Sequence, residues 1–166
     1  MSQALVEAQL ALDDGEFPVG CVLVLDGDII GRGHRHNSEG DCGNELDHAE
    51  VVTLRGLLAQ KPSVDCKGIT AYSTMEPCLM CYATMLLSGI RRFVWAYEDI
   101  MGGGTSLPLN AVAPLYEEMR VELVPGILRQ ESLALFYQFF QKYSYWQDSL
   151  LEQYTVEQFN KTSHGK

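Results

Sequence analysis

Apolar residues recur along the chain with two different spacings, one typical of helices and one typical of strands. Near the N-terminus, alanines and leucines within residues 2–14 fall at helical spacing. The segments 18–25 and 28–34 are largely apolar, and they are joined by Asp26-Gly27, a favoured two-residue turn between strands. The first third of the chain therefore predicts a helix followed by a β-hairpin.

The rest of the chain repeats these patterns in alternation. The further strands that we expect are 69–74, 92–97 and 120–125. The further helices that we expect are 47–60, 79–89, 110–118, 127–142 and 147–159. Strands that alternate with helices predict an α/β fold, in which helices cover both faces of a mixed or largely parallel sheet.

Length and composition limit the class of protein. The chain has 166 residues, which suits one domain, and its 46% hydrophobic and 20% charged residues are ordinary for a globular protein. We expect disorder only in the tail 161–166. No apolar run approaches the roughly 20 residues needed to cross a bilayer, and the N-terminus does not resemble a secretory signal. These features predict a cytoplasmic protein with no membrane partner.

Charge and cysteine content narrow the expected chemistry. The chain carries 22 acidic and 12 basic residues, for a formal charge of -10. Proteins that bind nucleic acids usually need a Lys/Arg surface, so this balance disfavours a polyanionic partner. An odd number of cysteines without a secretory signal favours reduced thiols and metal binding over a disulfide framework. The five cysteines are Cys21, Cys42, Cys66, Cys78 and Cys81.

Three of the candidate metal ligands lie at the starts of predicted helices. His48 opens one helix, and Cys78 and Cys81 follow Pro77 in the first turn of another. The two cysteines are three residues apart, so both sulfurs share one helix face and can bind a single ion. One imidazole and two thiolates leave zinc a fourth position for water, which is the arrangement of a catalytic site. Glu50, two residues after His48, is placed to accept the proton of that water.

Each of these residues also has an ordinary structural explanation. Two cysteines at this spacing can exchange disulfides or fill a core, a single His is usually structural, and a Glu at a helix start is usually a cap. A redox role lacks the expected Trp-Cys context and leaves His48 and Glu50 unexplained. The combination of His-x-Glu with a later Pro-Cys-x-x-Cys favours zinc chemistry.

Five ordered segments resemble the cytidine deaminase-like superfamily, whose signature is H-x-E and P-C-x-x-C. They are 16-EFPVGCVLV-24, 31-GRGH-34, 48-HAE-50, 76-EPCLMC-81 and 102-GGGTSL-107. Within the superfamily, the sequence is most similar to bacterial tRNA adenosine deaminases and their guanine and cytosine deaminase relatives, over roughly residues 3–141.

This resemblance implies an architecture and an assembly. The implied fold is a three-layer α/β/α sandwich with a mixed five-stranded sheet, the cytidine deaminase-like fold. One deaminase domain would occupy residues 1–160, with a C-terminal helical extension from about residue 143. The resemblance also implies a homodimer.

The resemblance further implies roles for individual residues. One zinc ion per chain would be held by His48, Cys78 and Cys81, and it would make a water nucleophilic enough to attack the amino-bearing carbon of a base. Glu50 would transfer the protons. The implied substrate-binding residues are Asn37, Asp99, Pro18 and Ala49. Asn37 also suits an ordinary turn.

Two regions depart from the pattern of the tRNA enzymes. Arg35-His36 is an insertion after 31-GRGH-34, and 44-NELD-47 replaces the Asp-Pro-Thr-Ala that often precedes the zinc-binding His. The segment 143–158 is rich in aromatic and acidic residues, whereas the tRNA enzymes tend to end in a basic helix. Its aromatic residues would either cover a neighbouring site or pack within an amphipathic helix, and their spacing favours packing.

Three functions remain open on this evidence. The first, which we expect, is deamination of a small nucleobase, free or as a nucleoside. The alternative is a tRNA adenosine deaminase, for which Arg91, Arg92, Arg120 and Arg129 are the candidate phosphate contacts. The third function, from a different class, is a non-catalytic zinc-binding subunit. Glu50 argues against it, because a structural zinc site has no use for a free carboxylate.

Overall fold

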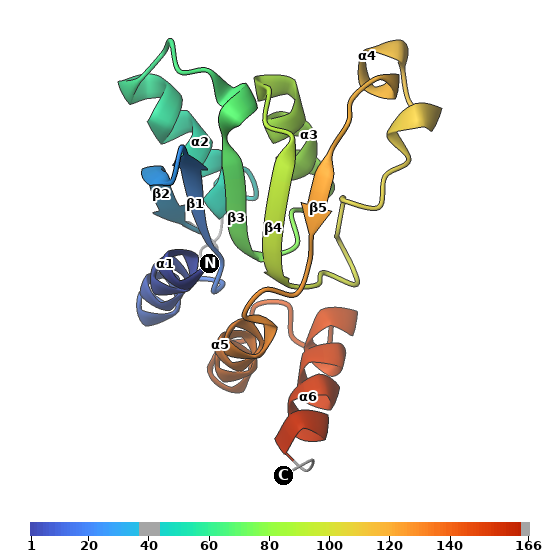
Figure 1. The fold of residues 1–166 in the computed structure, drawn as a ribbon. Coiled ribbons are helices and arrows are strands. Elements are labelled where there is room, and N and C mark those ends of the chain that lie inside the picture. Colours follow the sequence, from blue (N-terminus) through green and yellow to red (C-terminus); the bar gives the residue numbers. More distant parts are fainter. Residues whose placement is uncertain (37–43, 164–166) are drawn as a thin grey trace.

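The computed structural model describes residues 1–36 and 44–163 of the chain. A five-stranded sheet forms the centre, with strand order β2-β1-β3-β4-β5 (Figure 1). The first strand is antiparallel to both of its neighbours, whereas the last three strands are parallel. The predicted mixed sheet is therefore confirmed. Its strands are β1 (Gly20–Leu25), β2 (Asp28–His34), β3 (Thr70–Met75), β4 (Arg92–Tyr97) and β5 (Glu122–Val124).

Helices cover the sheet in two layers, which confirms the predicted α/β/α architecture. Helices α1 (Ser2–Asp13) and α5 (Arg129–Lys142) pack against each other and against the sheet, and α6 (Leu150–Ser163) packs against α5. Helices α2 (Ala49–Gln60) and α3 (Leu79–Ser88) form the other layer (Figure 1).

The region between β4 and β5 differs from the sequence prediction. In place of one helix over 110–118, the chain forms a 3-10 turn at Leu109–Ala111 and then the single-turn helix α4 (Pro114–Glu117). The proline explains the break, because it disfavours helical geometry in the residue before it. Ala113 is accordingly extended, with φ -63° and ψ 153°.

The hairpin between β1 and β2 turns as its sequence predicts. Asp26 and Gly27 both have positive φ, at 52° and 91°. Two consecutive residues with positive φ match the right-handed twist of the flanking strands, which is why Asp-Gly is favoured at this position.

The C-terminal part of the chain packs on the core through aromatic residues. Phe17, between α1 and β1, makes edge contacts with Phe136 and Phe139 of α5, with ring centroids 5.1 and 5.2 Å apart. The same ring contacts Tyr145, with centroids 5.6 Å apart. These contacts place the segment that follows α5 against the end of the sheet where β1 begins.

None of the helices among the described residues is long and apolar enough to cross a membrane. Cys21, Cys66, Cys78 and Cys81 are free thiols, while Cys42 lies outside the described residues. Helix α6 extends to Ser163, so residues 161–163 of the expected disordered tail are helical, and 164–166 are not described.

Close packing of α1 on β1 depends on Gly20. Ala4, Ala8 and Ala11 are fully buried, so helix and strand approach closely. A β-carbon on Gly20 would overlap the carbonyl oxygen of Ala4 and the amide nitrogen of Ala8, which are backbone atoms that cannot move independently.

We therefore expect Gly20→Ala to lower the free energy of unfolding by about 3 kcal/mol, because it pushes α1 away from the sheet. Gly56→Ala is the matched control. Gly56 lies within α2, and a β-carbon there would meet no atom within 4 Å. This control should stabilise the protein by about 0.5–1 kcal/mol. Urea denaturation measures both effects, and equal stability of the two variants would contradict the packing argument.

Candidate active site

The candidate site lies where two parallel strands end and two helices begin. Met75 and Tyr97 are paired at the ends of β3 and β4. His48 is the N-cap of α2, and Cys78 is the N-cap of α3. A helix N-terminus favours negative charge, so it stabilises a nearby thiolate. The fold thus brings together residues that are 30 positions apart in the sequence.

Three side chains form a compact group of metal-binding atoms. The Nδ1 atom of His48 lies 3.4 Å from Sγ of Cys78 and 3.5 Å from Sγ of Cys81. One donor atom from each residue lies within 4.8 Å of the other two. The predicted ligands therefore converge on one position.

The donor set fits zinc. Two thiols and an imidazole are soft or borderline ligands, which zinc prefers over oxygen-only sites. The second ring nitrogen of His48, Nε2, faces the Glu45 carboxylate at 3.7 Å. A carboxylate at this position orients an imidazole so that its other nitrogen faces the metal.

The two thiols differ in acidity. The hydrogen bond from Cys81, together with the contact to His48, lowers the pKa of Cys78 to about 4 although burial opposes ionisation. The same hydrogen bond and burial raise the pKa of Cys81 well above its usual value. A divalent cation at this position would stabilise both sulfurs as thiolates.

Glu50 lies beside this group. Only 3% of the residue is exposed, and its Oε1 accepts a hydrogen bond of 2.9 Å from the Ser73 hydroxyl. Burial, followed by the negative charge of Cys78, raises the pKa of Glu50. A carboxylate with a raised pKa can both accept and return a proton near neutral pH.

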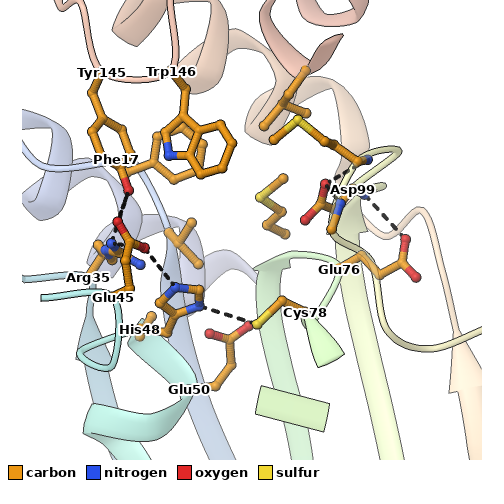
Figure 2. Close-up of a pocket in the computed structure, with 16 residues that line it drawn as sticks. Phe17, Arg35, Glu45, His48, Glu50, Glu76, Cys78, Asp99, Tyr145 and Trp146 are labelled. Atoms are coloured by element: carbon orange, nitrogen blue, oxygen red, sulfur yellow. Dashed lines mark hydrogen bonds and ion pairs between the residues drawn. The ribbon is translucent and has the colours of Figure 1, made fainter. Parts of the chain in front are cut away.

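These residues form one wall of a pocket with a volume of about 200 Å³. Figure 2 shows His48, Glu50 and Cys78 on one side of it and Tyr145 and Trp146 on the opposite side. The remaining lining is mostly apolar and comes from the segment before β1, from the ends of β3 and β4 with the loops that follow them, and from the start of α6. It includes Phe17, Val19, Met75, Met101 and Leu151.

The predicted substrate-binding residues have different positions. Asp99 and Ala49 line the pocket. One Asp99 oxygen, Oδ1, accepts hydrogen bonds from the amides of Met101 and Gly102, so part of this carboxylate holds its own loop. Pro18 is buried and its carbonyl faces the Thr74 hydroxyl, while its two sequence neighbours line the pocket. Asn37 lies outside the described residues.

Glu76 supports the loop on the other side of the site. Its carboxylate accepts hydrogen bonds from the Asp99 amide and the Thr105 hydroxyl. The amide of Gly104 donates to the carbonyl of Pro77, and a β-carbon on Gly104 would overlap the backbone of Leu79. The glycine loop therefore lies directly against the start of α3.

A comparison with protein families identifies this arrangement. Residues 1–97 match the model of the cytidine and deoxycytidylate deaminase zinc-binding region. The chain belongs to this deaminase family. The matched residues include the metal-binding group and Glu50, and the resemblance inferred from the sequence motifs is confirmed.

Similar proteins agree with the family assignment. The deaminase is 31% identical to a tRNA-specific adenosine deaminase of Bacillus subtilis over 142 residues, which cover 86% of this chain and 87% of that protein. A solved structure from a study of A-to-I editing by tRNA:A34 deaminases has a TM-score of 0.67 and 29% identity, covering 81% of this chain and 96% of the other. Guanine deaminase of Nitrosomonas europaea has the same TM-score at 20% identity, covering 83% and 81%, which supports the fold.

The pocket of this deaminase is also lined by residues that were not predicted as site residues, and four of them come from segments that depart from the family pattern. Arg35, Glu45, Tyr145 and Trp146 all line the pocket. Arg35 and Glu45 lie in the two segments that depart from the tRNA-enzyme pattern, so those departures were the available signal. For the C-terminal segment, packing was the favoured prediction. Helix α6 does pack on α5, but the two aromatic residues before it face the pocket.

The metal-binding group predicts a simple test. Cys78→Ser should lose bound zinc and melt at a lower temperature, because a bound metal stabilises the folded state by its binding free energy. Cys66→Ser is the control, since Cys66 is buried but lies outside the site. Metal analysis and thermal unfolding, with and without a chelator, measure the effect. A Cys78 variant that retains zinc would show that another residue set holds the metal.

Proposed function

We propose that this deaminase is a zinc-dependent hydrolase that removes the amino group of a small nucleobase, free or as a nucleoside, and releases ammonia. The observation that carries the proposal is the position of Glu50. It is buried beside the His-Cys-Cys group, yet it belongs to the pocket wall and not to the group itself. A non-catalytic zinc-binding subunit would have no need for a buried carboxylate at this position.

In this proposal, His48, Cys78 and Cys81 hold one zinc ion per chain. When bound, zinc supplies a Lewis acid that makes water nucleophilic near neutral pH. Glu50 accepts one proton from the water and delivers it to the ring nitrogen, and it then carries the remaining proton of the added hydroxyl to the amine, which leaves as ammonia. The hydrogen bond from Ser73 to Oε1 fixes the carboxylate and leaves Oε2 directed toward Cys81, 3.5 Å away.

The pocket geometry supports a small substrate. The Tyr145 and Trp146 rings stand opposite the metal-binding group (Figure 2), and aromatic rings in the wall of a pocket suit a planar ligand. Glu45 lies at the end of the pocket near Tyr145, and its side chain is 58% exposed. A polynucleotide would have to bring its phosphates past this carboxylate.

The candidate phosphate contacts do not face the pocket. Arg91, Arg92 and Arg120 line a depression near the starts of β3 and β4, at the opposite end of these strands. Arg129 is paired with Glu98, to which its Nε donates a 2.7 Å hydrogen bond. These positions favour a small substrate over tRNA.

Deamination of tRNA adenosine is the second candidate. The comparisons favour it over a free base, because the curated relatives that cover most of the chain are named tRNA-specific adenosine deaminases. A homodimer is also proposed from the family resemblance. Cationic residues of a second subunit would change the charge around the pocket, so the substrate has to be tested on the assembled protein.

We predict that Glu50→Gln retains zinc but loses at least about tenfold in kcat, equivalent to about 1.4 kcal/mol of barrier. The amide keeps the size of the side chain but cannot accept the proton. Glu7→Gln is the control, since Glu7 is another buried carboxylate and contacts His34 away from the pocket. Metal content and ammonia release are measured for both variants. A Glu50 variant with more than about a tenth of the wild-type rate would remove Glu50 from the mechanism.

The substrate is tested by an ammonia-release screen over adenine, guanine, cytosine, their nucleosides and unmodified tRNA. We expect turnover of at least one small compound. We also expect tRNA to bind with a Kd above about 10 µM at physiological salt, since few cations face the pocket. Efficient conversion of tRNA adenosine to inosine, with no turnover of small compounds, would establish the second candidate instead.

A further inference from the structure

The segment between α5 and α6 crosses the mouth of the pocket. Tyr145 and Trp146 line it from this segment, and Leu151 lines it from the first turn of α6. The Trp146 residue is 44% exposed, although its ring faces the pocket (Figure 2). A large aromatic ring that is partly exposed inside a pocket leaves apolar surface that a bound ligand can cover.

The Tyr145 side chain forms a triangle of hydrogen bonds with two other side chains, and we call this group of three the latch. The Tyr145 hydroxyl donates to Oε1 of Glu45 at 2.8 Å and accepts from Nη2 of Arg35 at 3.1 Å. The same nitrogen of Arg35 donates to Oε2 of Glu45 at 2.9 Å. The latch consists of Arg35, Glu45 and Tyr145.

Charge and burial explain why the side chains of the latch pair with one another. Arg35 is only 3% exposed, so its charge requires a partner, and Glu45 supplies one. Burial opposes ionisation of Glu45, but hydrogen bonds from Arg35 and Tyr145 outweigh it and lower its pKa. An ionised Glu45 is therefore held between the C-terminal segment and the residues preceding α2.

The backbone next to the latch adopts an uncommon conformation. Trp146 and Asp148 have φ of 59° and 62°, a region that side-chain-bearing residues rarely occupy. Such conformations persist where surrounding contacts determine them. Here the latch holds the residue immediately before Trp146.

We propose that Trp146 is a specificity-determining residue whose indole packs on the planar face of the substrate's base, and that the latch positions it. The inference rests on the proposed function, because it requires a planar nitrogen heterocycle as ligand. Trp146 contacts the substrate directly, whereas Arg35, Glu45 and Tyr145 are positioning residues. We call Tyr145 and Trp146 the cap. The cap would then select a compact ligand, since Trp146 occupies the side of the pocket opposite the metal-binding group.

Steady-state kinetics test the role of the ring. Trp146→Ala should raise KM by about tenfold or more while kcat changes by less than about threefold, because the ring contributes stacking and no proton transfer. Trp146→Phe should restore most of the affinity, since it retains an aromatic face. A wild-type KM in Trp146→Ala would overturn the proposal.

A matched pair of tyrosine variants tests the latch. Tyr145→Phe removes the hydroxyl that joins Arg35 and Glu45 but keeps the ring, and it should raise KM several-fold. Tyr154→Phe removes a hydroxyl that donates to Glu98 outside the pocket, and its KM should stay near the wild-type value. Equal effects of the two variants would show that the latch does not position Trp146.

Fluorescence quenching decides the same question without turnover. The chain has two tryptophans, and Trp95 is only 6% exposed, so acrylamide should quench mainly Trp146. Tyr145→Phe should alter this quenching and Tyr154→Phe should not. In the Glu50→Gln protein, at least one of adenine, guanine and cytosine should protect Trp146 from acrylamide, and the Trp146→Phe version should show no such protection.

Deamination kinetics and acrylamide quenching together separate the role of the cap from the proposed function. If a base protects Trp146 but no small compound is deaminated, the proposed function is wrong and the cap stands. If small compounds are deaminated normally by Trp146→Ala, the function stands and the cap is wrong. If none of the three bases protects Trp146, the stacking role is overturned whatever the enzyme's substrate.

Discussion

Glu50 is buried and Cys78 beside it is half-buried, so two acidic groups meet at a place where isolated charges are costly to remove from water. The surrounding groups stabilise these acidic side chains. Two helices begin at the pocket, His48 directs one ring nitrogen toward the thiols, and Ser73 donates to the carboxylate. A zinc ion fits the same need, because it would stabilise both thiolates. The metal-binding group would thus stabilise these acidic side chains in the folded protein as well as supply reactivity.

Charged groups are also paired with one another at the mouth of the pocket. Glu45 lies between His48 and Arg35, so one carboxylate links the metal-binding group to the C-terminal segment. Through Tyr145, this link reaches a part of the chain that follows the fifth strand and a further helix. Contacts of Phe17 with α5 and with Tyr145 support the arrangement from the apolar side. The cap and the metal-binding group therefore belong to one connected set of contacts.

Sequence similarity establishes the family of this chain, and the names of relatives at about a third identity favour tRNA adenosine. The residues that surround the pocket here decide whether a polynucleotide can enter. Arg92 and Arg120 lie at the far end of the sheet, while Glu45 and the aromatic cap stand at the pocket. Charge and shape around one type of metal site can change the substrate without changing the reaction.

Much of this protein was determined by local sequence. The strands, most helices, the Asp26-Gly27 turn and the metal-binding group follow from spacing and turn chemistry, because each depends on residues close together in the chain. The helix break at Pro114 belongs to the same class of local effects, although the predicted helix ran across it. The three-layer sandwich with a mixed five-stranded sheet followed from the family resemblance carried by the motifs, whereas the order of the strands came from the structure.

Only the tertiary structure brought Arg35, Glu45 and Tyr145 together. Arg35 and Tyr145 are 110 positions apart, and no spacing rule connects an insertion after β2 with a segment after α5. Helical periodicity favoured packing for the whole C-terminal segment, and it was correct for α6. It could not place Tyr145 and Trp146, because they precede the helix and their direction is set by the latch and by left-handed backbone geometry. Local pattern determined the chemistry of the site, and long-range contacts decided what covers it.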